Sequence, residues 1–275
     1  LLPRSRLPVY LAGHEIRGAF GPVEVGPVKF EDVKKVGCLG GGIMGGGIAQ
    51  VVAQAGYEVV VRDISDEAIA KTRHAIEDGK WGMKRAVERG KLGFDDALAA
   101  MARISYSTDL AALADCDVII EAIPEKLDLK QQVFAELDRL AKPEAIFATN
   151  TSGFCIQDVA RDVSDARKER FIGMHFSNPV TVMRMCEVIW TPQNSEEVIA
   201  TARKLAEAAG KEVSMVKDTP GTYGFILNRV FAAAYREARA GEELPPRVEA
   251  LMYFLDGRAY VTLRQLPQAH AAFEH

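Results

Sequence analysis

A histidine and a glutamate lie in two successive predicted strands. His175 closes the strand expected over 171–175, and Glu187 lies 12 residues further on, in the strand expected over 186–190. A turn at Asn178-Pro179 lets the second strand return along the first, which brings the imidazole and the carboxylate together. Histidine, whose unperturbed pKa is about 6.5, takes up an alcohol proton near neutral pH, and a carboxylate orients its ring. Each residue alone is more typical of a structural histidine or a surface acid, so the pair gains weight only from further motifs.

A glycine-rich loop supplies the second kind of chemistry. Residues 40–45 read G-G-G-I-M-G, which fits the pattern G-x-G-x-x-G between a predicted strand and a predicted helix. Gly40 allows the tight turn, Gly42 lets the backbone approach a pyrophosphate, and Gly45 allows the helix to pack closely on the strand. The helix N-terminus at Ile43 and Met44 offers free N–H groups to phosphates. The motif alone also fits a simple tight turn, but its context favours dinucleotide binding.

Asp63 extends that context. It follows the second predicted strand, 18 residues after Gly45, where a carboxylate accepts hydrogen bonds from the adenosine ribose hydroxyls. A carboxylate there repels a 2′-phosphate, so the predicted cofactor is NAD and not NADP. The neighbouring Arg62 is compatible with NADP, but strand alternation points its side chain away from Asp63.

Several downstream motifs complete a recognisable set. They are N-T-S at 150–152, G-M-H-F-S-N-P at 173–179, C-E-V-I at 186–189 and G-F-I-L-N-R at 224–229. Together with residues 40–49, this set resembles the L-3-hydroxyacyl-CoA dehydrogenase family, which includes 3-hydroxybutyryl-CoA dehydrogenase. The resemblance extends over about residues 34–236, roughly three quarters of the chain.

The resemblance implies a role for each matching residue. His175 is then the catalytic base with Glu187 as its partner, and Ser152 and Asn228 hold the substrate oxygen. Glu125 and Lys130 contact the nicotinamide side of NAD, and Asn150 is counted with the cofactor-binding residues. Simpler interpretations exist for several of these residues: Ser152 as a helix cap, Asn228 as a helix-surface residue, and Glu125 with Lys130 as an exposed helix start.

The predicted reaction is the reversible, NAD-dependent oxidation of an L-3-hydroxyacyl-CoA to the 3-ketoacyl-CoA, in fatty-acid metabolism. The expected partner is therefore an acyl-CoA substrate, and a homodimer is possible. Two alternatives are a dehydrogenase of a small 3-hydroxy (sugar) acid, which has a similar His-Phe-x-Asn-Pro motif, and a non-catalytic NAD-binding protein. Positive charge for a CoA nucleotide is available between 66 and 89, at Lys71, Arg73, Lys80, Lys84 and Arg85.

The elements that must position these residues alternate between strand and helix. This order predicts an α/β fold with a Rossmann-type, doubly wound, mainly parallel sheet and a short C-terminal helical domain. We expect a poorly structured arm or linker over 1–33, an NAD-binding domain over 34–217 and a shortened helical domain over 218–275. The expected strands are 36–39, 58–62, 104–107, 118–122, 145–149, 171–175, 186–190 and 211–216. The main expected helices are 43–55, 128–140, 196–209 and 225–240, together with a charged helical region over 66–89 that is broken near Gly79 and Gly82.

The chain departs from the family pattern at a few places. Three extra residues, Thr222-Tyr223-Gly224, enter the loop that leads to Asn228 and threaten its register with the substrate. Ser177 stands where a second Phe is usual, and Lys126 replaces a usual Asn. The stretch after Tyr223 is short for the family's second domain, which puts dimerisation in doubt.

Composition excludes several classes of function. The 275 residues are 48% hydrophobic and 26% charged, which is typical of a globular protein, and the formal net charge of −4 argues against nucleic-acid binding. No apolar run approaches the roughly 20 residues of a membrane span, and no signal peptide is evident, so a cytoplasmic location is expected. The four cysteines fit buried thiols in a reducing compartment, and neither they nor the histidines have metal-ligand spacing.

Overall fold

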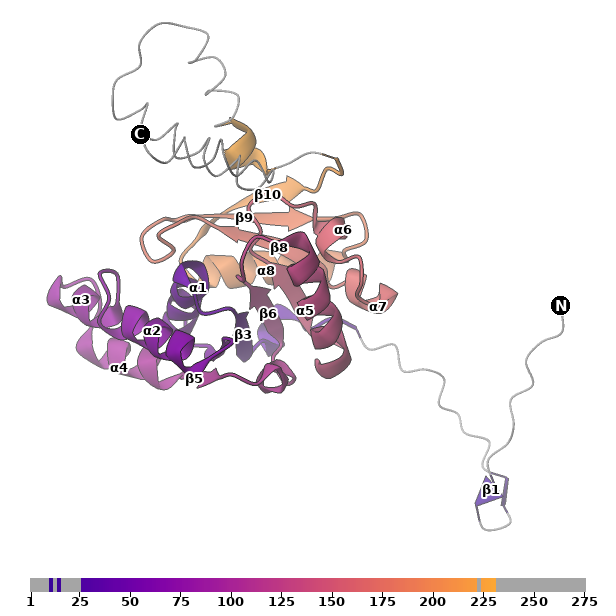
Figure 1. The fold of residues 1–275 in the computed structure, drawn as a ribbon, viewed down its shortest axis with the longest axis horizontal. Helices are drawn as coiled ribbons and strands as arrows, with labels where there is room; N and C mark the ends of the chain where they lie inside the picture. The colour runs from indigo at the N-terminus through magenta and orange to yellow at the C-terminus, as the bar shows by residue number, and fades with distance from the viewer. Residues whose placement is uncertain (1–9, 12–13, 16–25, 222–223, 231–275) are drawn as a thin grey trace, which may run out of the picture.

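The computed structural model describes residues 10–11, 14–15, 26–221 and 224–230. Within these ranges it contains an antiparallel pair, β1 (Tyr10–Leu11) and β2 (His14–Glu15), and an eight-stranded sheet with flanking helices (Figure 1). Most of the arm expected over 1–33 and most of the helical domain expected over 218–275 lie outside the described residues.

The sheet has the order β10-β9-β8-β7-β6-β3-β4-β5. Strands β3 to β8 are parallel to their neighbours, whereas β9 runs antiparallel to β8 and carries β10 parallel to itself. This arrangement confirms the doubly wound, mainly parallel sheet. Its strands are β3 (Lys35–Leu39), β4 (Glu58–Arg62), β5 (Ile104–Ser107), β6 (Val118–Glu121), β7 (Ile146–Thr149), β8 (Phe171–Phe176), β9 (Met185–Trp190) and β10 (Glu212–Lys217).

Helices cover both faces of this sheet (Figure 1). One apolar cluster joins Val36 and Cys38 of β3 to α1 (Ile43–Gln54) and α8 (Glu196–Ala208). A second cluster contains Leu39 together with α5 (Leu127–Leu140), α6 (Ile156–Val159) and the 3-10 helix η2 (Leu110–Leu113). Alternate side chains of β3 enter opposite clusters because successive residues of a strand point to opposite faces.

The charged stretch after β4 forms two helices, as the two glycines within it led us to expect. α2 (Asp66–Glu77) ends before Gly79, and α3 (Met83–Glu88) begins after Gly82. A Cβ on either glycine would lie within 3 Å of backbone atoms of the preceding turn, so the chain folds tightly here. A further helix, α4 (Phe94–Ala102), was not predicted, and it packs on α1.

Serine side chains cap the N-termini of α8 and α2. Ser195 accepts a hydrogen bond from the N–H of Val198, 3.3 Å away, and Gly210 ends the turn after α8 with a φ of +76°. Ser65 caps α2 in the same way. The remaining short helices are α7 (Asp165–Lys168) and the 3-10 helix η1 (Phe30–Asp32).

Two boundaries differ from expectation. Val28 and Val33 are buried in the core, and the N–H of Val28 donates to the carbonyl of Glu144, so the packed body begins ahead of residue 34. The last helix begins at Ile226 and is described as far as residue 230. Among the described helices, none combines the length and the apolar composition that crossing a bilayer requires.

Candidate active site

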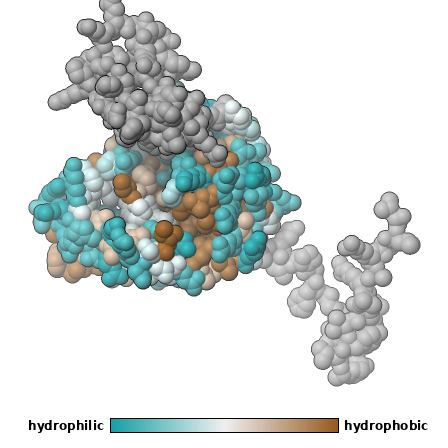
Figure 2. All heavy atoms as spheres, viewed as in Figure 1, coloured by the Kyte–Doolittle hydropathy of each residue, from teal (hydrophilic) through white to brown (hydrophobic). Residues whose placement is uncertain are grey.

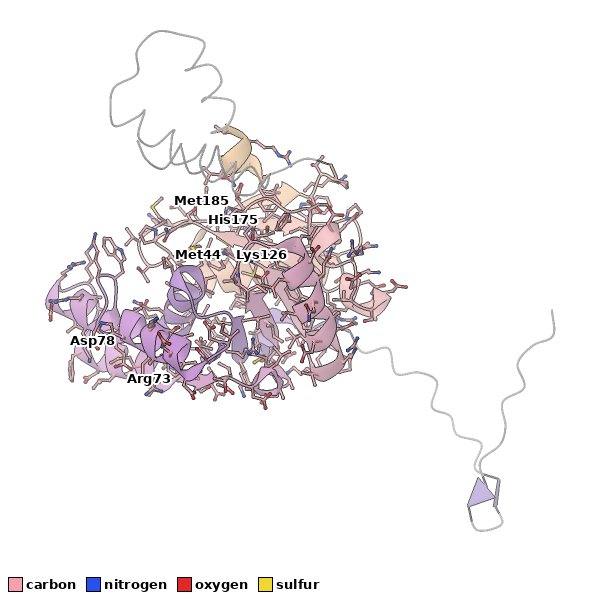
Figure 3. The ribbon with its side chains drawn as sticks, viewed as in Figure 1. Met44, Arg73, Asp78, Lys126, His175 and Met185 are labelled. Carbon is pink, nitrogen blue, oxygen red and sulfur yellow. The ribbon has the colours of Figure 1, made fainter. Side chains whose placement is uncertain are left out.

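The reversal between β8 and β9 brings His175 and Glu187 together. The two residues are directly opposite in the antiparallel register, and Nδ1 of His175 lies 2.7 Å from Oε2 of Glu187. Glu187 is 1% exposed and His175 is 8% exposed. An ionised carboxylate only accepts hydrogen bonds, so Nδ1 carries the proton and Nε2 keeps its lone pair for another partner. In Figure 3, His175 lies in the middle of the molecule, above Met44 of α1.

The second oxygen of Glu187 faces the last helix. Oε1 accepts a hydrogen bond from the N–H of Leu227 at 2.9 Å, and the ring of Phe225 lies 5.9 Å from the imidazole of His175. Both carboxylate oxygens are therefore engaged, which holds the Glu187 side chain in one orientation. The sequence contained no signal for this backbone contact, because it depends on the path of the chain after β10.

Asn228 and Ser152 meet across the site. The Nδ2 amide of Asn228 donates to the carbonyl of Ser152 at 2.8 Å, and the N–H of Gly224 donates to the carbonyl of Gly153 at 3.1 Å. The three extra residues at 222–224 therefore leave Asn228 beside the Ser152 loop. Asn228 thus lies beside Ser152, the other residue to which the resemblance assigns the substrate oxygen.

Glu125 and Lys130 belong to a buried charge network. Oε1 of Glu125 accepts from the Thr151 hydroxyl at 2.5 Å and from the N–H of Ser152 at 2.9 Å, which fixes the Ser152 loop. Nζ of Lys130 lies 3.2 Å from Oε2 of Glu125 and 2.5 Å from Oε1 of Glu121. The side chain of Lys130 is only 1% exposed, and its ammonium contacts Glu121, Glu125 and the carbonyl of Ile123.

Glu121 is a functional neighbour that the sequence did not reveal. Its carboxylate is fully buried at the end of β6 and accepts from the N–H of Ile123 and from the hydroxyl of Thr149, each at 2.7 Å. Burial raises the pKa of Glu121, against the opposing effect of the Lys130 ammonium. The only available signal was an acid at the end of an apolar strand, followed nine residues later by a lysine on the next helix.

Asn150 links the ends of two neighbouring strands. Its Oδ1 accepts a hydrogen bond from the N–H of Phe176 at 2.8 Å, and the residue is 8% exposed. Asn150 follows β7 and Phe176 closes β8, immediately after His175. The side chain therefore positions the strand end that presents His175.

The glycine loop has the geometry that a pyrophosphate requires. Gly40 has a φ of +93°, which L-residues rarely adopt. A Cβ on Gly45 would lie 1.8 Å from the carbonyl oxygen of Gly40, whereas a Cβ on Gly42 would meet nothing within 4 Å. Gly42 thus leaves open space at the N-terminus of α1, beside Ile43 and Met44.

Asp63 lies directly beside this loop. Its Oδ2 accepts from the N–H of Gly41 at 2.7 Å, and its Oδ1 accepts from the N–H of Ile64. Arg62 turns toward β5, where its Nε donates to the carbonyl of Thr108 at 3.2 Å. The loop follows β3, where the strand order reverses, because β4 lies on one side of β3 and β6 on the other. Doubly wound sheets bind nucleotides at this point. These residues fit NAD.

A cavity of about 600 Å³ extends from the glycine loop between α1 and α2. Asp63 and Gly42 line one end, and Trp81 and residues 178–181 line the other. Lys71 and Lys80 line this cavity, and Nζ of Lys71 also pairs with Oε1 of Glu67 at 2.7 Å. Three further basic residues of the region are directed elsewhere: Arg73 stacks on Tyr106, Lys84 pairs with Asp78, and Arg85 pairs with Glu88.

Apolar side chains gather on one face of the molecule. Figure 2 shows hydrophobic residues gathered near the middle of this face, flanked by hydrophilic side chains. Arg73 and Asp78 lie out on the α2 side of the molecule in Figure 3, away from His175. Within the part of the chain that the structure describes, no three histidine, cysteine, aspartate or glutamate side chains gather as metal ligands do.

Comparison with known proteins identifies the family. The family described as "3-hydroxyacyl-CoA dehydrogenase, NAD binding domain" matches residues 35–219. Human mitochondrial hydroxyacyl-coenzyme A dehydrogenase is 39% identical over 209 residues, which make up 75% of this chain and 65% of that protein. A probable 3-hydroxybutyryl-CoA dehydrogenase of Deinococcus radiodurans is 40% identical over 204 residues, or 74% of this chain and 70% of the relative.

A solved structure agrees with the sequence relatives. The crystal structure of 3-hydroxybutyryl-CoA dehydrogenase from Escherichia coli K12 matches with a TM-score of 0.72 at 30% identity, over 88% of this chain and 53% of that one. This chain spans about two thirds of the length of the curated relatives it matches, 65% of the human protein and 70% of the Deinococcus protein. With its NAD-binding domain over residues 35–219, the chain belongs to the 3-hydroxyacyl-CoA dehydrogenase family.

Proposed function

We propose that this chain catalyses the reversible oxidation of an L-3-hydroxyacyl-CoA to the 3-ketoacyl-CoA with NAD, in fatty-acid metabolism. The observation that carries the proposal is the buried pair formed by Nδ1 of His175 and Oε2 of Glu187, 2.7 Å apart, beside Ser152 and Asn228. An imidazole whose Nδ1 is hydrogen-bonded to a carboxylate and whose Nε2 carries a lone pair can accept the proton of an alcohol.

Each residue of the pair then has a defined task in the oxidation. His175 Nε2 accepts the proton of the substrate hydroxyl, and Glu187 stabilises the imidazolium that results. Ser152 and Asn228 hold the substrate oxygen, which fixes the direction of the reacting C–H bond and lowers the entropic part of the barrier. Bound NAD supplies the hydride acceptor.

The remaining residues position the cofactor in this proposal. Gly40, Gly42 and Gly45, with the N–H groups of Ile43 and Met44, take the pyrophosphate, and Asp63 takes the adenosine ribose. Glu125 contacts the nicotinamide side while it clamps the Ser152 loop. Lys130 acts through Glu125, and Asn150 acts through the strand end that carries His175. We take residues 34–217 as the NAD-binding unit and the segment from 218 as the start of the helical one.

Two lysines support a nucleotide-bearing substrate. Lys71 and Lys80 line the cavity, and the ammonium of Lys80 lies 5.1 Å from the centre of the Trp81 ring. Positive charge beside an exposed aromatic face suits the phosphates and the base of a CoA nucleotide. Competition by free CoA separates the two substrate classes, since a small-acid dehydrogenase would show none.

The decisive test is the loss of NADH absorbance on addition of acetoacetyl-CoA, with wild type and His175→Ala compared side by side. We expect turnover in the wild type and a loss of about 10²–10⁴-fold in the variant, the usual contribution of a general acid–base group. NADH binding, followed by fluorescence, serves as the control for folding and should be equal in both proteins. Equal turnover in the two proteins would remove His175 from the mechanism. NADH binding without turnover of any 3-ketoacyl-CoA would favour a non-catalytic NAD-binding protein.

Self-association and location complete the proposal. Ile226 and Val230, 46% and 60% exposed, form an apolar edge at the start of the last helix, which supports a homodimer through this helix. A light-scattering mass of twice the chain mass is expected, and a monomer mass would contradict it. Four buried free cysteines support a reducing compartment such as the cytoplasm. Fractionation of the source cells tests this location.

A further inference from the structure

Lys211 is a buried cation to which the proposed reaction gives no task. It precedes β10 and is 8% exposed. Its ammonium donates to the main-chain carbonyl of Val180, and to that of Met183 at 3.1 Å. Among the described residues, no carboxylate pairs with it. A lysine of this kind serves as a donor to the backbone, and both of its acceptors belong to one loop.

That loop joins the two strands of the His175–Glu187 pair. It runs from the end of β8 to the start of β9, and its residues 178–181 line the nucleotide cavity. The side chain of Val180 is buried against α1, where a Cβ on Gly47 would lie 2.9 Å from Cβ of Val180. Gly47 lies in the first turns of α1, the helix that begins at the glycine loop. The loop is thus held between Lys211 on one side and α1 on the other.

The chemistry of Lys211 is suited to this task. Burial lowers the pKa of its ammonium, and the electrostatic effect of Cys186 opposes this shift only in part. Carbonyl dipoles are the only polar partners described for Lys211, so two loop carbonyls are held at fixed distances from β10. An apolar side chain would leave both buried carbonyls without that donor.

We propose that Lys211 is a positioning residue for cofactor binding: through Val180 and Met183 it holds the 178–183 loop over α1 and so sets the width of the cavity. The inference rests on the proposed use of this cavity for a nucleotide. It does not depend on turnover, because NADH binding reports on it directly.

The first test is Lys211→Met, which keeps the length and apolar stem of the side chain and removes its donors. The dissociation constant for NADH, measured by fluorescence titration, is expected to rise about five- to tenfold, as for the loss of one or two buried hydrogen bonds. In turnover, KM for NADH should rise while kcat stays within about twofold, because the substitution leaves the contact between His175 and Glu187 unchanged. Lys204→Met is the matched control, since Lys204 is an exposed lysine paired with Glu31.

A second test acts on the loop from the opposite side. Gly47→Ala places its new Cβ against Val180, and weaker NADH binding is expected here too. The double variant Gly47→Ala/Val180→Gly removes the clashing Cβ of Val180 together with its two methyl groups and should recover most of the affinity. If the new methyl group acted on the ligand directly, the double variant would bind as weakly as Gly47→Ala alone, and this outcome would overturn the proposal.

Other outcomes are equally clear. Lys211→Met with a lowered melting temperature and unchanged NADH affinity would reduce Lys211 to a structural role and overturn the proposal. If Lys211→Met does not fold, the Gly47 pair of variants decides the question. A chain that binds NADH with the expected differences but turns over no 3-ketoacyl-CoA would contradict the proposed reaction and leave the role of Lys211 intact.

Discussion

At the scale of single residues, chemistry here depends on which atoms are already engaged. The contact between Nδ1 of His175 and Glu187 assigns the proton to Nδ1 and leaves the lone pair on Nε2, the nitrogen that is the base in the reaction we propose. The same principle applies to the glycine loop, where three glycines of one motif have different neighbours. Gly40 needs its left-handed backbone, Gly45 has no room for a methyl group, and Gly42 faces open space.

A pair of alanine substitutions should separate these glycine roles. Gly42→Ala should fold with an unchanged melting temperature and bind NADH at least about tenfold more weakly, because the methyl group occupies the approach to the phosphates. Gly45→Ala should lower the melting temperature as well, because its Cβ would lie 1.8 Å from the carbonyl oxygen of Gly40. Thermal melts and NADH titrations of both variants provide the measurement. Equal melting temperatures for the two would contradict this assignment.

At the scale of elements, buried charges join strands and helices that are distant in sequence. Asp117 precedes β6, and its Oδ2 accepts from the N–H groups of Lys34 and Lys35 at 2.7 and 2.8 Å, while its Oδ1 pairs with Lys142. Burial alone would raise the pKa of Asp117, but these hydrogen bonds outweigh burial and hold the pKa below its ordinary value of 3.8. A depressed pKa stabilises the fold at a pH above 3.8 and ceases to do so as the pH falls through the folded-state value.

Asp117→Asn should therefore destabilise the protein in a pH-dependent way. At pH 7 we expect the free energy of unfolding to fall by about 2 kcal/mol, as for loss of charge-assisted hydrogen bonds. The difference in unfolding free energy between wild type and variant should narrow as the pH falls below 3.8. In that range the Asp117 carboxylate of the wild type takes up a proton, first in the unfolded state and then in the folded state. Urea titrations between pH 7 and acid pH measure this difference. A gap that stays constant with pH would show that the charge of Asp117 is not its cause.

The Glu121–Lys130 pair gives a second prediction at this scale. Lys130→Met leaves the Glu121 carboxylate buried without its cation and should cost about 3–5 kcal/mol of stability. The double variant Glu121→Gln/Lys130→Met removes both charges, so it should recover much of that loss. Urea unfolding of the single and double variants measures the coupling. Equal losses in the single and double variants would mean that the two charges are not coupled.

At the scale of the whole molecule, the segment that follows β10 contributes residues to the candidate site. The other residues of that site lie on the sheet, earlier in the chain. Oδ2 of Asp218 lies 2.9 Å from both the N–H of Ile156 and the Sγ of Cys155, so this segment is tied to the start of α6, close to Ser152. From there the chain reaches Leu227 and Asn228, which contact Glu187 and Ser152. The site is thus shared between two parts of the chain.

Asp218→Ala should loosen this connection without touching the glycine loop. We expect kcat for acetoacetyl-CoA reduction to fall about tenfold, because Asn228 loses its fixed position, while the NADH dissociation constant stays unchanged. Steady-state kinetics and NADH titration measure the two quantities separately. A change in NADH affinity of the same size as the change in kcat would contradict a role confined to the C-terminal segment.

The local patterns of the sequence were sufficient for the elements and for much of the site. Glycines 40–45 between a strand and a helix, Asp63 after the next strand, and the strand–turn–strand that joins His175 to Glu187 depend on neighbours in the chain, so short-range rules place them. The α4 helix was not predicted because the apolar residues of its sequence follow a helical period less clearly than those of α5 or α8.

Only the tertiary structure decided which side chains are buried together. The Glu121–Lys130 pair, the Leu227 N–H on Glu187 and the Lys211 donors on the 178–183 loop join residues from separate elements, and the register that creates these contacts comes from packing around the sheet. Nothing in the sequence separates Lys211 from solvated lysines, and the resemblance that singled out Lys130 did not indicate its burial. Their roles arise because burial removes water and leaves a carboxylate or a carbonyl as the partner, and burial is a property of the assembled fold.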